Sequence, residues 1–169
     1  MPKNSLPKMN IELPEGGCCP KFDPTGWDDQ ELVFENRLFV QMNTINFLHI
    51  PLNMGSAIKK SCEKAKEAKA DPKDHYLLLS HDPSPWRGNH FMEVTKEVEG
   101  LTNVKISGKF LTKVFEGPYK EAGKWCKEME DLVAKKGRKL KKLYMFYTTC
   151  PKCIKHWGKN YVIGFAEVE

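Results

Sequence analysis

The sequence predicts an α+β protein in which two β-α-β-β repeats form a curved, mostly antiparallel sheet with two helices on one side. Strand and helix patterns follow one another in the same order twice, over residues 36–99 and 103–168. The two helical patterns are offset by roughly 64 residues, as in an internal repeat. Hairpins outnumber crossover connections, so a doubly wound parallel sheet is excluded.

The composition is that of a globular chain. Of its 169 residues, 40% are hydrophobic and 29% are charged, so the chain can bury a core and does not resemble a disordered protein. Residues 1–30 are rich in Pro, Gly and Asp and are expected to form an irregular arm, while residues 31–169 form a single domain. No segment has the length of a signal peptide's apolar core or of a membrane span, which predicts a cytoplasmic protein without a membrane partner.

The first repeat opens with a β-rich run over residues 37–50. A helix is expected next, with Asn53 as its N-cap. Its apolar residues fall on one stripe at helical spacing: Met54, Ala57, Ile58, Cys62, Ala65 and Ala68. Two strands, HYLLLSHD and HFMEVTKEV, then flank the turn-rich segment PSPWRGN.

The second repeat has the same order. A strand over residues 104–116 leads into a helix that has Pro118 in its first turn and ends at Gly137. The stripe of this helix comprises Tyr119, Ala122, Cys126, Met129 and Val133. Two closing strands, KKLYMFYTT and NYVIGFAEVE, enclose a cysteine-containing loop. Since Cys62 and Cys126 occupy equivalent places on the two stripes, both are expected to be small core residues.

The net charge of +5 is mild. The dense basic run KKGRKLKK stands where the second helix ends, and basic side chains there complement the negative end of the helix dipole. No aromatic residues are interleaved with the run, as a stacking surface for nucleic acid would require. We therefore expect no nucleic-acid partner.

The segment FEGPYKEAGKWCKEMEDLVAKKG, together with LYMFYTTCP and YVIGFAEV, resembles the GyrI-like small-molecule-binding family. In that family a strand leads into a Gly-Pro-Tyr helix start, which is Gly117-Pro118-Tyr119 here. The resemblance spans residues 36–168 as an architecture. It implies a stand-alone protein that binds a small organic molecule, flat or amphiphilic, in a cleft between the repeats. The residues expected to form this ligand site are Trp86, Phe91, Glu93, Phe115, Tyr119, Tyr147 and His49.

One position departs from the family pattern. Members that bind cationic drugs or act as hydrolases place a buried Glu in the final strand, where this sequence has Gly164. Glu93 and Glu167 are the nearest substitutes on the closing strands. The sequence also has no Gly-x-Ser-x-Gly motif and no phosphate-binding glycine loop. Three function classes stay open: a small-molecule-binding protein, a small hydrolase or thiol-dependent enzyme, and a zinc-stabilised interaction domain.

Two cysteine pairs carry the remaining chemistry. The segment GGCC supplies Cys18 and Cys19, and CPKCIKH supplies Cys150, Cys153 and His156. A thioredoxin-like redox motif is disfavoured, because only 16 residues follow the second CPKC cysteine and that fold needs several further elements. A structural zinc site needs four nitrogen or sulfur ligands, which these residues supply if the arm folds across the loop.

Trp27 and Trp157 are expected to bring the two cysteine segments into contact. Each lies in a loop, where an exposed Trp is costly, so each is expected to pack its loop onto the body of the protein and bring the cysteine pairs together. Three interpretations of the cysteines stay open: a zinc site, a thiol or redox pair, and reduced loop cysteines with no chemistry of their own.

Overall fold

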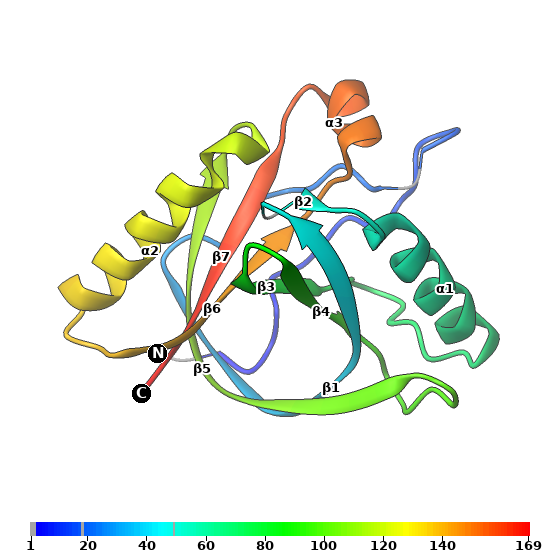
Figure 1. The fold of residues 1–169 in the computed structure, drawn as a ribbon, viewed down its shortest axis with the longest axis horizontal. Coiled ribbons are helices and arrows are strands. Elements are labelled where there is room, and N and C mark those ends of the chain that lie inside the picture. Colours follow the sequence, from blue (N-terminus) through cyan, green and yellow to red (C-terminus); the bar gives the residue numbers. More distant parts are fainter. Residues whose placement is uncertain (1–2, 18, 49) are drawn as a thin grey trace. The chain divides into compact units, whose positions relative to one another are not determined.

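The computed structural model describes residues 3–17, 19–48 and 50–169 (Figure 1). Two of the expected site residues, Cys18 and His49, lie outside the described residues. The chain divides into two compact units. We call residues 1–35 and 107–169 the terminal unit, and residues 36–106 the central unit.

The described part of the central unit contains antiparallel strands and one helix. Its elements are most of β1 (Gln30–Phe47), β2 (Ile50–Pro51), α1 (Met54–Glu67), β3 (Leu78–Ser84) and β4 (Arg87–Glu93). β1 pairs with both β2 and β4, and β4 pairs with β3. The predicted strand, helix and hairpin are confirmed, although β1 begins earlier and β4 ends earlier than the sequence pattern indicates.

α1 follows the predicted N-cap residue, Asn53. The Asn53 side chain does not cap the helix but accepts a hydrogen bond from the Ile45 backbone at 3.0 Å, which ties the helix start to β1. The sulfur of Cys62 lies 3.6 Å from that of Met92 on β4. Cys62 is half-buried, so the prediction of a core cysteine is only partly met. One core cluster of this unit consists of Val40, Ala65, Ala70, Val94 and Val98.

Among its described residues, the terminal unit contains three antiparallel strands and two α-helices. Its elements are most of β5 (Thr102–Glu116), η1 (Tyr119–Glu121), α2 (Ala122–Lys135), β6 (Leu140–Tyr147), α3 (Pro151–Trp157) and β7 (Tyr161–Val168). β7 pairs with both β5 and β6, so it is the middle strand of the three. α3 is a short helix in the segment where the sequence predicts a loop.

α2 covers the sheet of the terminal unit with an apolar stripe. Trp125, which the predicted stripe does not include, is buried and stacks on Phe115 with the ring centroids 5.5 Å apart. Met129 and Val133 are buried, as expected. The other predicted stripe residues are only partly buried against this core: Tyr119, Ala122 and Cys126. The apolar face of α2 is therefore centred on Trp125, Met129 and Val133.

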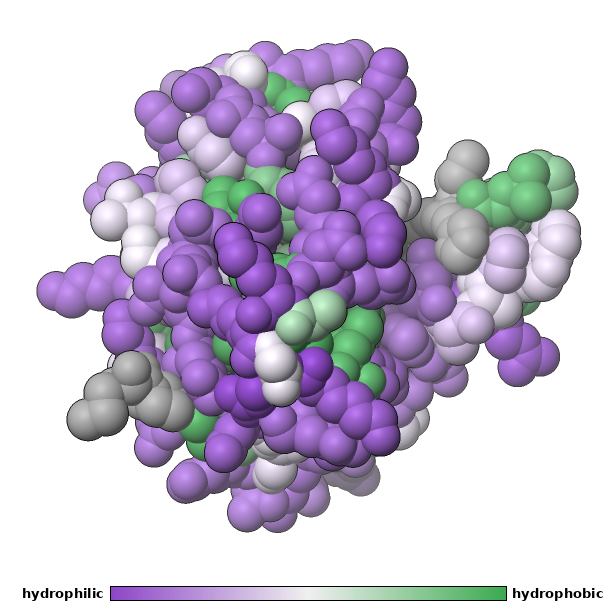
Figure 2. Space-filling view, turned by 90° about the vertical axis from the view of Figure 1, so that its left-hand side faces the viewer, coloured by the Kyte–Doolittle hydropathy of each residue, from purple (hydrophilic) through white to green (hydrophobic). Residues whose placement is uncertain are grey.

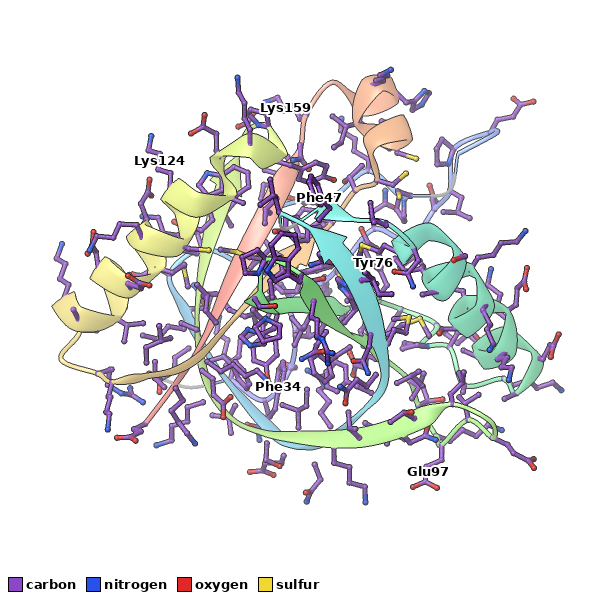
Figure 3. All side chains as sticks on the ribbon, viewed as in Figure 1. Phe34, Phe47, Tyr76, Glu97, Lys124 and Lys159 are labelled. Carbon is purple, nitrogen blue, oxygen red and sulfur yellow. The ribbon has the colours of Figure 1, made fainter. Side chains whose placement is uncertain are left out.

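The opposite face of α2 is charged. Lys124, Lys127 and Glu130 are exposed there, and Figure 3 labels the first of them. The surface on the α2 side of Figure 1 is largely hydrophilic (Figure 2). Within the described part of the chain, no helix combines the length and the apolar character needed to cross a membrane.

Gly164 lies on β7 beneath α2. A Cβ atom at this position would lie 2.5 Å from the sulfur of Met129, whose side chain is fully buried. Met129 thus fills the space next to the position where the resemblance implies a buried Glu. Any side chain at position 164 therefore requires Met129 to move.

The described residues of the arm, 3–17 and 19–29, form no helix, and they contribute to the core of the terminal unit. Trp27 is fully buried, and its ring lies near those of Phe22, Phe146 and Phe165. The Thr112 hydroxyl of β5 donates a hydrogen bond to the Trp27 carbonyl at 2.5 Å. The Val114 backbone donates to the Asp28 carboxylate at 2.9 Å. These contacts fasten the arm along β5.

Candidate metal centre and adjoining pocket

Three cysteine side chains converge in the terminal unit. The sulfur atoms of Cys19, Cys150 and Cys153 all lie within 4.8 Å of one another. Cys153 is buried and the other two are half-buried. The prediction that the CPKC cysteines lie close to the arm cysteines is therefore confirmed for Cys19, and its neighbour Cys18 lies outside the described residues.

The start of α3 places two of these sulfurs on one side. Cys150 is the N-cap residue of α3 and has an extended backbone, and Pro151 stands at the first helical position, where its missing N–H has no cost. Cys153 lies three residues on, and residues at this spacing share one face of a helix. The helix ends at Gly158, whose φ of 76° is in the left-handed region that favours glycine.

Two hydrogen bonds connect the arm to α3. The backbone N–H of Cys150 donates to the sulfur of Cys19 at 3.4 Å. The indole N–H of Trp157 donates to the Cys19 carbonyl at 3.3 Å. Trp157 thus holds the two cysteine segments together, as predicted. Trp27, which is fully buried, anchors the same arm in the core of the terminal unit.

Tyr119 of the Gly-Pro-Tyr segment lies next to the cysteines. Its hydroxyl donates a hydrogen bond to the carbonyl of Thr149, the residue before Cys150, and its ring meets that of Tyr147 edge-on at 5.4 Å. Burial, with smaller contributions from Cys150 and Cys19, raises the pKa of Tyr119 to about 12. The phenol is therefore a neutral hydrogen-bond donor at physiological pH.

His156 does not belong to the group of converging side chains among the described residues. Its ring is exposed and lies against that of Trp157 with centroids 4.5 Å apart. The described donor set consists of three sulfur atoms. Sulfur ligands of this kind suit zinc and other soft or borderline metals.

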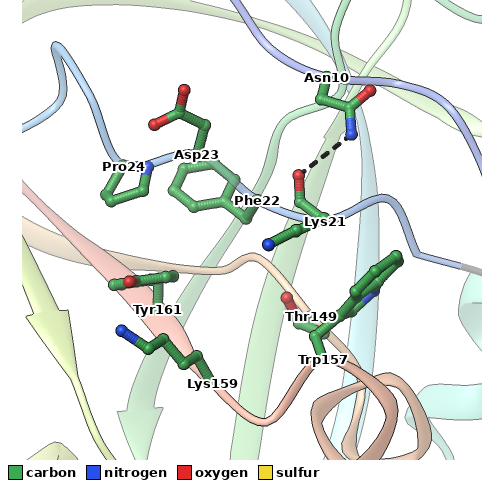
Figure 4. A pocket seen from close by; sticks show the side chains of 9 residues that line it. All are labelled: Asn10, Lys21, Phe22, Asp23, Pro24, Thr149, Trp157, Lys159 and Tyr161. Carbon is green, nitrogen blue, oxygen red and sulfur yellow. Dashed lines mark hydrogen bonds between the residues drawn. The ribbon is translucent and has the colours of Figure 1, made fainter.

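The terminal unit has a pocket of about 550 Å³, one wall of which is Thr149, the residue before Cys150 (Figure 4). Its described walls come from the arm on one side and from the α3 segment on the other: Asn10, Lys21, Phe22, Asp23, Pro24, Thr149, Trp157, Lys159 and Tyr161. The rings of Phe22 and Tyr161 lie 6.3 Å apart. Asn10 donates to the Lys21 carbonyl at 3.4 Å, which links two parts of the arm.

Of these pocket walls, Trp157 is the one that the sequence singles out. Lys21, Phe22 and Asp23 directly follow the arm cysteines, and Lys159 and Tyr161 closely follow Trp157. Their closeness in sequence to the two segments that meet here is the signal that indicates them as pocket walls.

The residues that the resemblance implies as ligand-binding lie elsewhere. Trp86 is exposed, and the centroid of its ring lies 6.0 Å from that of Phe47. Phe91 is buried in the central unit and Phe115 is buried beneath Trp125. Tyr119 and Tyr147 adjoin the cysteines as described. None of the described walls of the pocket is one of these residues, and their role in a cleft stays a prediction.

Glu93, another expected ligand residue, is part of a buried ion pair. Its carboxylate is 8% exposed and lies 2.8 Å from the Arg37 Nε atom and 2.9 Å from the His75 Nε2 atom. The other nitrogen of His75 lies 2.7 Å from the Asp74 carboxylate. The hydrogen bond to Glu93 raises the pKa of His75 above its ordinary value, against the opposing effect of burial.

The comparison with known proteins assigns the chain to a family. The model of the family described as "Bacterial hydrolase" matches residues 9–168, which include the arm, the pocket and both cysteine segments. The chain belongs to this family. Among curated proteins, none matches the chain significantly.

Several solved structures have a similar fold at low sequence identity. An uncharacterised conserved protein from Listeria innocua has a TM-score of 0.62 at 12% identity, over 84% of this chain and 92% of that one. A hydrolase from Listeria innocua has a TM-score of 0.58 at 12% identity, over 84% of this chain and 92% of that one. The EcmrR C-terminal domain has a TM-score of 0.57 at 13% identity, over 86% of this chain and 99% of that one. At these identities the likeness shows the α+β fold and not a shared activity.

Proposed function

We propose that this protein is a small-molecule hydrolase whose ligand pocket is held together by a zinc ion bound at Cys19, Cys150 and Cys153. The observation that carries the proposal is the convergence of three sulfur atoms within 4.8 Å, although the sequence separates Cys19 from Cys150 by 131 residues. Three thiols brought together from two segments have the geometry of a ligand set.

The spacing of the sulfurs supports a metal. Zinc binds thiolate sulfur at about 2.3 Å, so sulfurs around one tetrahedral ion lie about 3.8 Å apart. The three sulfurs observed within 4.8 Å need to approach one another by no more than about 1 Å to bind zinc. The remaining coordination position would be taken by a further side chain or by a water molecule.

The pocket supports the link between metal and ligand. Its walls come from the same two segments that supply the cysteines: Phe22 lies three residues after Cys19, and Trp157 four residues after Cys153. A metal that joins the segments therefore fixes the width of the pocket. Zinc in this role organises the site and stabilises the folded chain.

The pocket walls also indicate the class of ligand. The rings of Phe22, Tyr161 and Trp157 suit a flat molecule. The exposed ammonium groups of Lys21 and Lys159 outnumber the single carboxylate, Asp23, among the described walls and favour an anionic ligand. We therefore propose a flat aromatic acid or its hydrolysable derivative as the ligand. Family membership supports hydrolysis as the reaction.

We further propose that the two units derive from one duplicated β-α-β-β module of the GyrI-like type. The element order β1-α1-β3-β4 of the central unit matches β5-α2-β6-β7 of the terminal unit. In the first set β4 pairs with β1 and β3, and in the second β7 pairs with β5 and β6. The matching strand order supports a common origin of the two halves.

Native mass spectrometry tests the metal. The protein purified with zinc in the buffer should carry one zinc ion, and Cys153→Ser should lose it. Cys126→Ser is the matched control, because it removes a half-buried cysteine from α2, outside the cluster. A wild-type protein that carries no metal under these conditions contradicts the proposal.

A fluorescence titration tests the pocket. Flat aromatic carboxylates should quench the emission of Trp157, and the quenching should disappear in Trp157→Phe but persist in Trp86→Phe, since Trp86 is not a wall of this pocket. Esters of the same acids, incubated with the protein, should yield the free acids. Binding without hydrolysis would identify a binding protein, and no binding would exclude the pocket as the ligand site.

A further inference from the structure

A chain of hydrogen bonds connects five polar side chains in the central unit. Ser80 Oγ lies 2.7 Å from His90 Nδ1, and His90 Nε2 lies 2.9 Å from Thr44 Oγ1. Thr44 Oγ1 lies 2.9 Å from Asn46 Oδ1, and the Asn46 amide nitrogen lies 3.4 Å from the Asp82 carboxylate. All but Asp82 are buried. The side chains come from β1, β3 and β4.

The direction of the hydrogen bonds can be assigned from the Asp82 end. A carboxylate can only accept, so the amide NH₂ of Asn46 faces Asp82 and the amide oxygen faces Thr44. The Thr44 hydroxyl has one proton, which it donates to that oxygen. Thr44 can then only accept a hydrogen bond from His90.

The hydrogen bond to Thr44 also determines the tautomer of His90. Burial lowers the pKa of His90 below its ordinary value, so the ring is neutral at physiological pH and carries one N–H. That proton lies on Nε2, because Thr44 must receive it. Nδ1 therefore has its lone pair available, and Ser80 donates its hydroxyl proton to it over 2.7 Å. The Ser80 hydroxyl thus donates to the basic nitrogen of His90, whereas the Thr44 hydroxyl accepts from the N–H of the ring.

We propose that Ser80 is a nucleophile and His90 its general base, in a second reaction centre of the protein that acts on carboxylic esters. Asn46 and Thr44 are positioning residues that hold the imidazole in the required tautomer, in the manner of the third member of a hydrolytic triad. This centre lies in the central unit and does not depend on the proposed zinc ion.

The reaction balances without a cofactor. Ser80 Oγ forms a bond to the ester carbonyl carbon, and its proton moves to Nδ1 of His90. As the carbon–oxygen bond to the leaving group breaks, the same proton moves to the departing alcohol, leaving acyl-Ser80. A water molecule then attacks the acyl carbon, gives a proton to Nδ1, and the Ser80 oxygen leaves and takes up that proton. The net reaction converts ester and water into acid and alcohol.

The residues around the hydrogen-bonded side chains limit the size of the substrate. Ser80 is 6% exposed, so the ester must present a small acyl group. Gly88 lies against the hydrogen-bonded side chains and leaves room for them. A Cβ atom at this position would lie 2.6 Å from Thr44 Oγ1 and 3.0 Å from both His90 Nε2 and the Asp82 carboxylate. The geometry therefore requires glycine at position 88.

Covalent labelling of the full-length protein tests the proposal. A small fluorophosphonate should form an adduct on Ser80, mapped by peptide mass spectrometry, and p-nitrophenyl acetate should be hydrolysed. Ser80→Ala should abolish both reactions, and His90→Gln should slow them by about 100-fold or more. Ser84→Ala is the matched control on the same strand and should react as the wild type does.

Several outcomes would overturn the proposal. These are an adduct on another residue, an unreactive wild-type protein, or an unchanged rate in Ser80→Ala. Mapping the adduct in the wild type keeps the test decisive if His90→Gln does not fold. Labelling of Ser80 should persist after zinc is removed with a chelator, so failure of the metal proposal and failure of this one are distinguishable.

Discussion

The buried carboxylate of Glu93 connects the stability of the central unit to pH. The hydrogen bond that it receives from His75 raises the pKa of His75 from its ordinary value of 6.5. A group whose pKa is raised by folding stabilises the protein fully below its unfolded pKa, and this contribution is lost as the pH rises through the folded pKa. The stabilisation by His75 is thus present below about pH 6.5 and fades above it.

Thermal melts across this range test the ion pair. The melting temperature of His75→Gln should lie furthest below that of the wild type near about pH 5.5, and the two should converge toward about pH 9. Lys73→Gln is the control, because Lys73 is exposed and pairs only with Asp71 in the described contacts. A difference that stays constant with pH would show that His75 does not titrate with folding.

Gly164 provides a steric prediction at a single position. Gly164→Ala introduces a Cβ within 2.5 Å of the buried Met129 sulfur and should destabilise the protein by about 1–3 kcal/mol. Gly123→Ala, on α2 with open space around it, should instead stabilise by up to about 1 kcal/mol. Urea denaturation of the two variants measures the contrast. Equal stabilities would mean that Met129 moves aside without cost.

At the scale of elements, α2 depends on one aromatic contact. Trp125 is 4% exposed and stacks on Phe115 with an interplanar angle of 18°. Trp125→Ala should cost about 3–5 kcal/mol, as expected for removing a buried aromatic side chain. Lys127→Ala, two residues on and exposed, should change the stability by less than about 0.5 kcal/mol. A loss below about 1 kcal/mol in Trp125→Ala would show that α2 is held elsewhere along its length.

The sequence predicted most elements because their signals are local. Alternating strands, the Asn53 helix start and the Gly137 helix end all depend on neighbouring residues, and the structure has them. α3 was missed because seven residues are too few for a helical period to be recognised. Trp125 was missed because its burial depends on Phe115, which belongs to another strand.

The site was predicted only where a packing argument connected distant segments. Two loop tryptophans indicated that the arm meets the CPKC segment, and Cys19 does meet Cys150 and Cys153. The pocket and the Ser80–His90 chain depend on strand pairing and side-chain direction across several elements. Those are properties of tertiary structure, and no spacing in the sequence encodes them.

At the scale of the whole molecule, the proposed zinc ion should control how firmly the arm is held. Zinc that binds only the folded chain adds about 4 kcal/mol of stability when present at 1,000 times its dissociation constant. A chelator should therefore lower the melting temperature of the wild type. It should leave Cys153→Ser unchanged, because that variant lacks one of the three sulfur ligands.

Hydrogen exchange locates the effect of metal removal. The amides that should exchange faster lie in two segments, residues 19–24 and 148–161, because these carry the cysteines and the pocket walls. Backbone amides of β3 and β4, whose paired register lies entirely within the central unit, should be unaffected. Faster exchange confined to the two segments means that the metal fastens the pocket. Equal acceleration over the whole chain would assign the metal to global stability alone, and no change in either unit would exclude a metal at the three cysteines.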